Sequence, residues 1–359
     1  MLRLIVDKIA STAALCSLSH QVALSSYVIA EEGYCVAVRA LEEKSSYNHL
    51  ECIDGTFETI EAGDLLVGVL GERQALRGYS GRIPRAIHPG DVLHVLNLGG
   101  IIGLCTSDHP SLGPALKVEV LGAVLIETAG RTSHARIQDH ALEPVYRLRH
   151  SAPLVVVSGT AMHTGKTMAA CRIIEGLTLR GLRVAAAKLT GAALLRDVRM
   201  MEEHGAIAGV TFTKAGVVAS TNKEMGPPAK ALVAHLNTFE PDIIVLELGD
   251  GFIGYYGVDG LLLDKELQRF AMAHVVAAND LAGVWAADHL FRQRYRAPIA
   301  VVTGPVTDNA VGIQYIQNAL GIPACNAQQE PERLADLVSH ALQASSSDHK
   351  LFYPSGIAL

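Results

Sequence analysis

The stretch Leu154-Val-Val-Val-Ser-Gly-Thr-Ala-Met-His-Thr-Gly-Lys-Thr167 decides how this 359-residue chain is organised. Its apolar first half predicts a buried β-strand, and the residues from Met168 to Leu177 predict a helix. Between them lies a loop that begins at Gly159 and ends in Gly165-Lys-Thr. A strand, a glycine-bracketed loop, Gly-Lys-Thr and a helix, in this order, describe a phosphate-binding loop.

The residue types of the loop suit phosphate. Backbone N–H groups at a helix N-terminus attract an anion, and the helix dipole favours negative charge there. Lys166 adds a positive charge for the β- and γ-phosphates, and Thr167 offers a hydroxyl to Mg²⁺. The alternative is a glycine-rich turn with a surface lysine, but the flanking strand and helix favour the phosphate loop. The expected nucleotide contacts are Gly159, Thr160, His163, Thr164, Gly165, Lys166, Thr167 and Met168.

Two details of the loop remain open. Five residues, Thr160 to Thr164, separate the first glycine from the Gly-Lys pair, which is one more than the usual spacing. His163 either approaches a phosphate or is a bystander, and the second reading is favoured.

Composition narrows the functional class. An apolar content of 49% with 18% charged residues is typical of a globular protein with sizeable cores. The net charge of −6 argues against nucleic-acid binding through a general basic surface. The six cysteines show no C-x-x-C pair, so we expect reduced, mostly buried thiols. The N-terminal apolar runs are too short for a signal peptide or a membrane span, which predicts a cytoplasmic protein without a membrane or nucleic-acid partner.

Four regions are expected along the chain. Residues 1–145 contain short apolar segments between turn residues, which predicts a small, mostly β domain of the kind in which a sheet closes on itself. Residues 146–152 are expected to be a linker, as part of a polar stretch from Arg131 to His150. Residues 153–345 form the predicted P-loop NTPase domain, and 346–359 a tail. The arginine-rich segment from Gly71 to Arg85 either grips an anion or is a solvated hairpin connection, and the connection is favoured.

From Leu154 onward, apolar strands alternate with helices, and the last of them are a short strand at Ile322–Cys325 and a helix from Pro331 to Ala344. This pattern predicts an α/β fold, a parallel sheet flanked by helices. Ligands of such sheets bind beyond the carboxyl ends of the strands. Polar residues stand at several expected strand ends: Lys188, Thr190, Glu247, Asp250, Asn279, Asp280, Thr303 and Gly304.

Three of these motifs together resemble the dethiobiotin synthetase family. That family carries a Gly-Thr-Asp-Thr-x-x-Gly-Lys-Thr loop with the same five-residue spacing as Gly159–Thr167. Its second strand ends in a Lys-Pro-x-x-x-Gly segment, similar to Lys188-Leu-Thr-Gly191, and its Val-Glu-Gly-Ala-Gly-Gly motif is similar to Leu246-Glu-Leu-Gly-Asp-Gly251. The resemblance covers about residues 153–325 and extends to amidoligases such as cobyrinate diamide synthase. Ala161 stands where the family loop has an aspartate.

The resemblance implies ATP and Mg²⁺ as cofactors. It implies Lys166 and Lys188 as catalytic residues, with Lys188 reaching the γ-phosphate or a substrate carboxylate. It implies Thr167, Asp197 and Glu247 as metal ligands. Asp197 can instead be a first-turn helix acid that complements the dipole.

Each of the other candidate binding residues has two possible interpretations. Thr303, Gly304 and Asn309 lie where this class often holds the nucleotide base, or they are ordinary loop residues. Asp250 is a second acidic ligand or a turn residue, and Tyr255 a substrate-side lid or a core residue. Asp280 is more readily a helix cap than a substrate contact. The residues considered for substrate binding are Thr190, Asp250, Asn279, Asp280 and Tyr255.

The function expected from these residues is an ATP- and Mg²⁺-dependent enzyme of the ligase type. It would activate a small carboxylate by phosphoryl transfer for amide, ring or related bond formation, with a homodimer as the expected assembly. The alternative is a nucleotide-dependent switch or assembly factor that acts on a protein partner. A third reading is a P-loop scaffold that only binds nucleotide.

Overall fold

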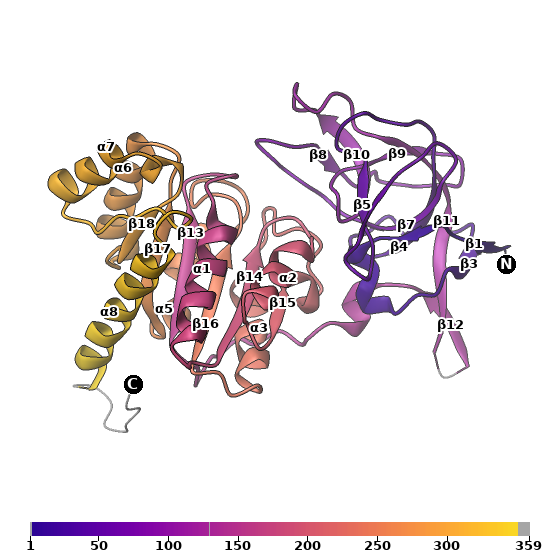
Figure 1. The fold of residues 1–359 in the computed structure, drawn as a ribbon. Coiled ribbons are helices and arrows are strands. Elements are labelled where there is room, and N and C mark those ends of the chain that lie inside the picture. Colours follow the sequence, from indigo (N-terminus) through magenta and orange to yellow (C-terminus); the bar gives the residue numbers. More distant parts are fainter. Residues whose placement is uncertain (1, 129, 351–359) are drawn as a thin grey trace. The chain divides into compact units, whose positions relative to one another are not determined.

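The structure, a computed structural model, describes residues 2–128 and 130–350 and divides into two compact units (Figure 1). The first unit contains the chain up to Glu143 together with Ala192–Arg196 and Thr211–Thr221. The second contains Pro144–Gly191, Asp197–Val210 and the chain from Asn222 onward. Two short segments that follow the phosphate-loop motif in sequence therefore belong to the N-terminal unit. The domain boundary expected from the sequence, after residue 145, does not assign these segments to that unit.

The first unit is built of short strands and helical turns. Its strands are β1 (Leu2–Ile5), β2 (Lys8–Ile9), β3 (Gln21–Ser25), β4 (Cys35–Ala40), β5 (His49–Glu51), β6 (Phe57–Thr59), β7 (Leu65–Leu70), β8 (Ser80–Arg82), β9 (Val92–Val95), β10 (Ile101–Ser107), β11 (Lys117–Thr128) and β12 (Arg131–His134). Its helical turns are η1 (Ser11–Cys16), η2 (Ile137–His140) and η3 (Phe212–Ala215). The predicted mostly β character of this region is confirmed.

Five of these strands close a ring. Pairing runs from β11 through β4, β7, β10 and β9 and returns to β11. Alternate side chains of β4 enter different apolar cores: Cys35 and Ala37 pack in one, Val36 and Val38 in the other. Because both faces of the strand are buried from Cys35 to Val38, these four residues are all apolar rather than alternating.

The polar stretch from Arg131 is not a linker at its start. Arg131–His134 forms β12, antiparallel to β11, and Ile137–His140 forms the turn η2. The side chains of β12 are mostly exposed. Backbone pairing at the margin of a sheet does not require apolar side chains, so the polar sequence concealed the strand.

The arginine-rich segment is partly interior. Arg73 is buried and donates to the backbone oxygen of Leu96 and, at 3.3 Å, to the Tyr47 hydroxyl. Tyr79 is also buried, with its ring edge-on to that of Tyr47. These two residues serve the core of the first unit, while Arg77 and Arg82 are exposed.

A buried carboxylate organises one end of the first unit. Glu51, at the end of β5, is fully buried and accepts from the Ser11 hydroxyl. It also accepts from the backbone N–H groups of Leu195, at 2.7 Å, and Arg196, at 2.6 Å. All these partners belong to the first unit. Glu51 therefore accepts from backbone N–H groups at the start of helix α2 (Arg196–Glu203), which have no backbone acceptor within the helix.

Glu51→Ala should lower the free energy of unfolding by about 2–3 kcal/mol, because buried donors lose their acceptor. Denaturant unfolding followed by circular dichroism measures the change. Glu61→Ala, at an exposed carboxylate of the same unit, should change it by less than about 0.5 kcal/mol. Equal losses in both variants would contradict the role given to Glu51.

The second unit is an α/β layer structure. Its strands are β13 (Leu154–Gly159), β14 (Val184–Thr190), β15 (Gly209–Thr211), β16 (Ile243–Leu248), β17 (Ala271–Ala277) and β18 (Val301–Thr303). Besides α2, its helices are α1 (Lys166–Leu179), α3 (Gly226–Asn237), α4 (Val258–Leu263), α5 (Lys265–Gln268), α6 (Leu281–Leu290), α7 (Ala310–Tyr315) and α8 (Pro331–Lys350). It also contains the π-helical segments η4 (Phe291–Tyr295) and η6 (Ile316–Leu320) and the 3-10 turn η5 (Pro305–Thr307).

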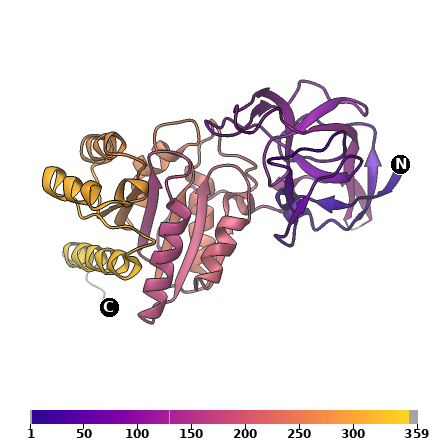
Figure 2. The same ribbon diagram turned by 45° about the horizontal axis from the view of Figure 1, so that its top comes forward.

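The strands of this sheet lie in the order β15-β14-β16-β13-β17-β18. Neighbours from β14 to β18 pair in parallel. Helices α1 and α8 lie against each other on one face (Figure 2), where Leu177 and Leu334 pack with Val155 and Val157 of β13. The parallel α/β fold predicted from the sequence is confirmed.

Two expectations at the C-terminal end differ from the structure. Ile322–Cys325 is not a strand, and contributes one parallel bridge between Ala324 and Val302. Helix α8 continues to Lys350, past its expected end at Ala344 and into the region expected to be a tail. The rest of that expected tail, residues 351–359, lies outside the described residues.

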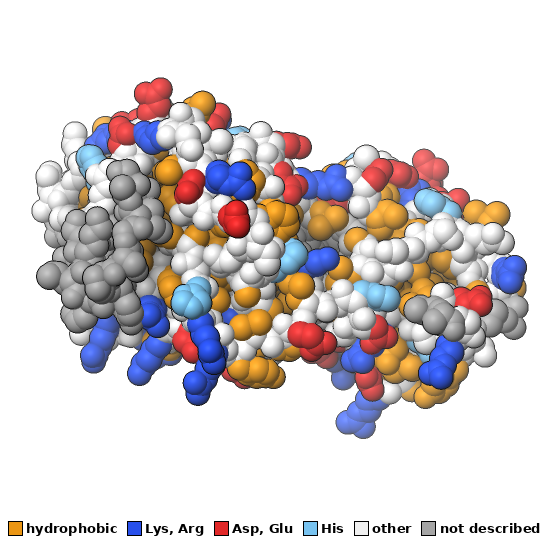
Figure 3. Space-filling view, turned by 90° about the horizontal axis from the view of Figure 1, so that it is seen from below, with side chains coloured by type: hydrophobic (Ala, Val, Ile, Leu, Met, Phe, Trp, Pro, Cys, Tyr) orange, Lys and Arg blue, Asp and Glu red, His pale blue; other side chains and the backbone are white. Residues whose placement is uncertain are grey.

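The described surface carries charges of both signs. On the face drawn in Figure 3, acidic and basic side chains are interspersed among apolar ones. Within residues 2–128 and 130–350, no helix has the length and apolar character needed to cross a lipid bilayer.

Candidate functional site

The phosphate loop connects the carboxyl end of β13 to the first turn of α1. His163 has a φ of 58° and Gly165 a φ of 85°, both in the left-handed region. A non-glycine residue such as His163 rarely adopts this conformation. Gly165 is the N-cap of α1, so the backbone amides of Lys166 and Thr167 open the helix.

The loop leaves no space for side chains at several neighbouring glycines. A Cβ atom on Gly159 would lie 2.6 Å from Thr164 Oγ1 and 3.0 Å from the Ala277 oxygen. A Cβ atom on Gly251 would lie 2.5 Å from the Thr160 oxygen, and one on Gly304 2.5 Å from the Thr164 oxygen. These three glycines come from the ends of different strands, so the shape of the loop depends on close approach of backbone to backbone.

Gly159→Ala should destabilise the second unit and distort the loop, because the added methyl group collides with backbone and with a buried hydroxyl. We expect a loss of about 1–3 kcal/mol in the free energy of unfolding. Gly260→Ala is the matched control, since a Cβ atom there meets nothing within 4 Å and alanine favours helix α4. A stable Gly159→Ala chain with unchanged hydrogen exchange in the loop would contradict this view of the loop.

Lys166 is buried inside the loop. Its ammonium donates to the Ala161 oxygen at 2.7 Å and to Thr164 Oγ1 at 3.4 Å. Both acceptors belong to the loop itself and are uncharged. The lysine ammonium therefore lies against the loop that would hold a phosphate group.

Glu247 lies at the centre of the charged groups. In the sheet it stands opposite Val157 of β13 on one side and Lys188 of β14 on the other. Its Oε1 accepts from the Thr167 hydroxyl at 3.0 Å. Its Oε2 is buried and has no hydrogen-bond partner among the described residues. Lys188 forms an ion pair with Asp197 of α2.

Burial works against the charges of this site. It raises the pKa of Glu247, and Lys188 and Lys166 act in the opposite direction. Burial also lowers the pKa of Lys166 to about 8, despite the nearby carboxylates of Glu247 and Asp250. Burial thus disfavours the charged forms of both Glu247 and Lys166. A ligand that supplied opposite charges would favour the charged forms again.

Lys166 should make stability depend on pH in the ligand-free chain. Its folded pKa of about 8 lies below the ordinary value of 10.5, so between these values the unfolded chain binds more protons and stability rises with pH. Relative to Lys166→Met, wild type should gain at most about 3 kcal/mol from pH 8 to 10.5. Denaturant unfolding of both proteins across this range measures the difference, and a flat difference would contradict the depressed pKa.

The oxygen donors of this site suit a magnesium ion that is coordinated mainly by the phosphate oxygens of a nucleotide and by water. The Thr167 hydroxyl and the free oxygen of Glu247 are hard oxygen donors of the kind Mg²⁺ prefers. Among the described residues no group of three or more His, Cys, Asp or Glu side chains could hold a metal by itself. Mg²⁺ commonly takes one or two protein groups plus phosphate oxygens and water, so these two residues fit it. Asp197 is engaged with Lys188, and its metal role stays a prediction.

Several residues expected near substrate or base have structural partners. Asp280 accepts from the Gly283 amide at 2.7 Å and caps α6, as favoured from the sequence. Asn309 caps α7 by accepting from the Val311 amide. Thr190 donates to the Gly249 oxygen at 2.9 Å.

The remaining candidates lie as follows. Thr303 is buried and accepts from the Ala327 amide, while Asn279 is partly buried. Tyr255 is 64% exposed, so the core reading does not apply to it. Asp250 has a φ of 67°, which suits a turn, yet it is near enough to raise the pKa of Lys166. His163 is exposed and Met168 partly buried in the first turn of α1.

Glycines that support the loop and the sheet edge beside it were not recognised as such from the sequence. A Cβ atom on Gly249 would collide with the oxygen of Thr190, the last residue of β14, and one on Gly283 would lie 3.1 Å from Thr160 Cγ2 of the loop. Gly304 approaches the loop backbone, and its role in base binding stays a prediction. Gly249 and Gly304 come directly after the buried strands β16 and β18, which identifies a crowded sheet edge but not the partner, whereas Gly283 in the first turn of α6 gives no such signal.

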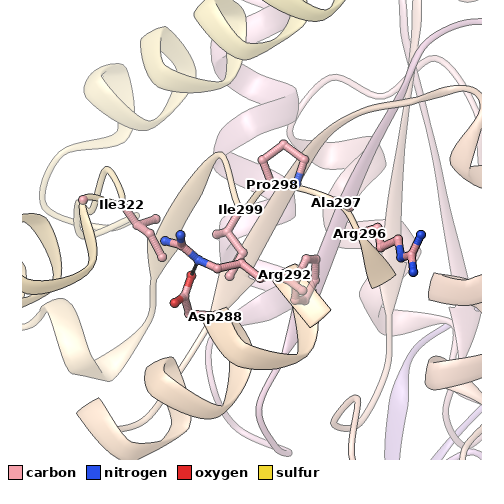
Figure 4. A pocket seen from close by; sticks show the side chains of 9 residues that line it. Asp288, Arg292, Arg296, Ala297, Pro298, Ile299 and Ile322 are labelled. Carbon is pink, nitrogen blue, oxygen red and sulfur yellow. Dashed lines mark hydrogen bonds and ion pairs between the residues drawn. The ribbon is translucent and has the colours of Figure 1, made fainter. Parts of the chain in front are cut away.

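A cavity of about 530 Å³ lies elsewhere in the second unit (Figure 4). It includes Pro298 and Ile299, which precede β18, so it opens at the amino edge of the parallel sheet, opposite the loop. Arg292 is paired there with Asp288 at 2.6 Å, and Arg296 points away from the other labelled side chains in Figure 4. None of the candidate residues lines it.

The strand that carries Glu247 lies directly beside the strand that leads into the loop, within a parallel sheet. This arrangement, with the Gly-Lys-Thr loop at the N-terminus of α1, decides the class. The second unit has the fold of a P-loop NTPase.

Comparison with known proteins adds fold neighbours only. No family model matches the chain, and no curated protein matches it. Solved structures similar to it include the signal recognition particle receptor FtsY from Elizabethkingia anophelis, at 14% identity and a TM-score of 0.34, covering 52% of this chain and 62% of that one. The hydrogenase maturation factor HypB from Archaeoglobus fulgidus has 16% identity and a TM-score of 0.34, covering 53% and 90%.

A DUF1611 family protein from Anabaena variabilis has 13% identity and a TM-score of 0.39, covering 57% of this chain and 63% of that one. The chain thus spans less than two thirds of the FtsY and DUF1611 structures. Because these scores are low, the class of the second unit rests on its own strand order and loop. Membership of the dethiobiotin synthetase family is not shown.

Proposed function

We propose that this chain binds ATP with Mg²⁺ at Gly159–Thr167 and transfers the γ-phosphoryl group to a small carboxylate. The observation that carries the proposal is a second lysine, Lys188, placed across the sheet from the buried Glu247 while Lys166 occupies the loop. Two cations at the carboxyl edge of the sheet suit a reaction in which an anionic phosphate meets an anionic acceptor.

The proposed reaction balances as follows. A carboxylate oxygen attacks the γ-phosphorus, the bond from that phosphorus to the bridging oxygen breaks, and ADP leaves. A nitrogen nucleophile then attacks the acyl phosphate, the carbon–oxygen bond to phosphate breaks, and an amide or ring forms with loss of inorganic phosphate and a proton.

The residues of the chain contribute position and charge. Lys166 would exchange the neutral Ala161 oxygen for a phosphate oxygen, which favours its charged form. Lys188 would orient the acceptor carboxylate, with Asp197 holding its ammonium in place. Thr167 and Glu247 would hold Mg²⁺, which neutralises phosphate charge when bound. A homodimer and a cytoplasmic location remain predictions.

A nucleotide-dependent switch is the second candidate. It is supported by the path of the chain after Lys188, since Ala192–Arg196 and Thr211–Thr221 belong to the first unit. In a switch, nucleotide hydrolysis would alter these segments and so change the binding of a protein partner.

Turnover with and without acceptors distinguishes the two. The purified chain is given ATP or GTP with Mg²⁺, and phosphate release is measured alone and with a panel of small mono- and dicarboxylic acids plus ammonia. The proposal predicts negligible release until one acid is added, together with ADP and a new amide or cyclised product by mass spectrometry. Release that no acid stimulates, or that only a protein partner stimulates, would contradict the ligase proposal.

Lysine variants test the site itself. Lys166→Ala and Lys188→Ala should each lower the acid-stimulated rate at least about 100-fold, because each removes charge stabilisation from a buried site. Lys166→Ala should also weaken nucleotide binding, whereas Lys265→Ala, at an exposed lysine of α5, should change neither. Full nucleotide affinity in Lys166→Ala would overturn the phosphate-loop assignment.

A further inference from the structure

Two cysteine thiols meet inside the first unit. Cys16 is the last residue of η1, and Cys35 is the first residue of β4. The Cys35 thiol donates a hydrogen bond to the sulfur of Cys16 across 3.7 Å. Both side chains are buried in the same apolar core, and both are free thiols.

The two thiols differ in their backbone setting and in their burial. Cys35 is fully buried, pairs with Val69 in the sheet and donates its backbone N–H to the Ala135 oxygen at 2.9 Å. Cys16 is 6% exposed and ends a short helical turn, where Ser17 has a φ of 49°. The sheet therefore fixes one sulfur, while the other lies at the edge of the core beside an irregular segment.

The hydrogen bond also distinguishes them chemically. Donation from Cys35 lowers the pKa of Cys16, although burial opposes this. The same bond, together with burial, raises the pKa of Cys35 well above its ordinary value. The thiolate is the reactive form of cysteine, so Cys16 has the character of an attacking thiol and Cys35 that of a resolving one.

We propose that Cys16 and Cys35 form a redox couple in which a peroxide oxidises Cys16 and Cys35 then closes a disulfide. The Cys16 sulfur attacks one peroxide oxygen, the O–O bond breaks, and water leaves, which gives a sulfenic acid. The Cys35 sulfur attacks this sulfur, the S–O bond breaks, and a second water leaves. In total two thiols and one hydrogen peroxide become one disulfide and two waters.

Disulfide formation needs only a small movement of the two sulfur atoms. A disulfide needs its sulfurs about 2.0 Å apart, so from 3.7 Å an approach of about 1.7 Å is sufficient. The bond would fasten η1 to β4 and close the chain between residues 16 and 35. Ser11, at the other end of η1, donates to Glu51, so the bond would also restrain the residue that organises the start of α2. The couple lies wholly in the first unit and does not rest on the proposed enzymatic function.

Peroxide treatment of the full chain tests the couple. After brief exposure to hydrogen peroxide and then denaturation, the thiol count by Ellman's reagent should fall from six to four, and dithiothreitol should restore six. Both cysteines lie in one tryptic peptide, so Glu-C protease is used, which cleaves after Glu31 and Glu32 between them. Mass spectrometry without reduction should then find the Cys16 and Cys35 fragments joined, with two hydrogens lost.

Cysteine-to-alanine variants identify which two cysteines form the disulfide. Cys16→Ala and Cys35→Ala should each abolish the joined fragments, while Cys105→Ala, at a partly exposed thiol, should form them as wild type does. An unchanged thiol count, a bond to another cysteine, or sulfinic acid at Cys16 beside free Cys35 would each overturn the proposal. If an alanine variant fails to fold by circular dichroism, the fragment map of wild type decides the question alone.

Discussion

The buried carboxylate of Glu247 can lie at the carboxyl edge of the parallel sheet only because cations and a hydroxyl surround it. An isolated charge at this depth would cost several kcal/mol, and a buried ion pair offsets this only with good hydrogen bonding. Here Thr167 donates to one oxygen, and Lys188 stands across the ladder. The opposite directions in which burial moves the pKa of Glu247 and that of Lys166 show that compensation is incomplete. In the proposed function, the charges of a bound nucleotide and its metal would complete the compensation of these buried charges.

The charges keep their positions because the backbone around them is crowded. Glycines at the ends of β13, β16 and β18 let the phosphate loop touch neighbouring strands without side chains between them. Main-chain contacts of this kind cannot be replaced by larger residues without moving the loop. Within this crowded backbone the Lys166 ammonium is held by the Ala161 oxygen and the Thr164 hydroxyl of the loop. The loop, which is one residue longer than usual, has a left-handed backbone at His163.

Local patterns predicted the fold of the second unit because strands buried on both faces are apolar throughout and alternate with helices. They predicted the loop because Gly-Lys-Thr follows such a strand. The helix cap at Asp280 was likewise local and was recognised. What local patterns did not show was β12, whose polar residues pair through backbone alone, and the interior place of Arg73. In both cases side-chain polarity predicted an exposed loop, but hydrogen bonds to distant segments of the chain determined where these residues lie.

By itself the sequence determined the class of the second unit, the position of its phosphate loop and the mostly β character of the first unit, since each follows from the spacing of apolar residues and glycines along the chain. Only the tertiary structure decided that Lys188 faces Glu247, that Asp197 is paired with Lys188, and that Glu51 and the Cys16–Cys35 pair are joined to residues far away in sequence. Strand register and chain crossing determine such contacts. Both depend on the packing of the whole unit, which no stretch of the sequence contains.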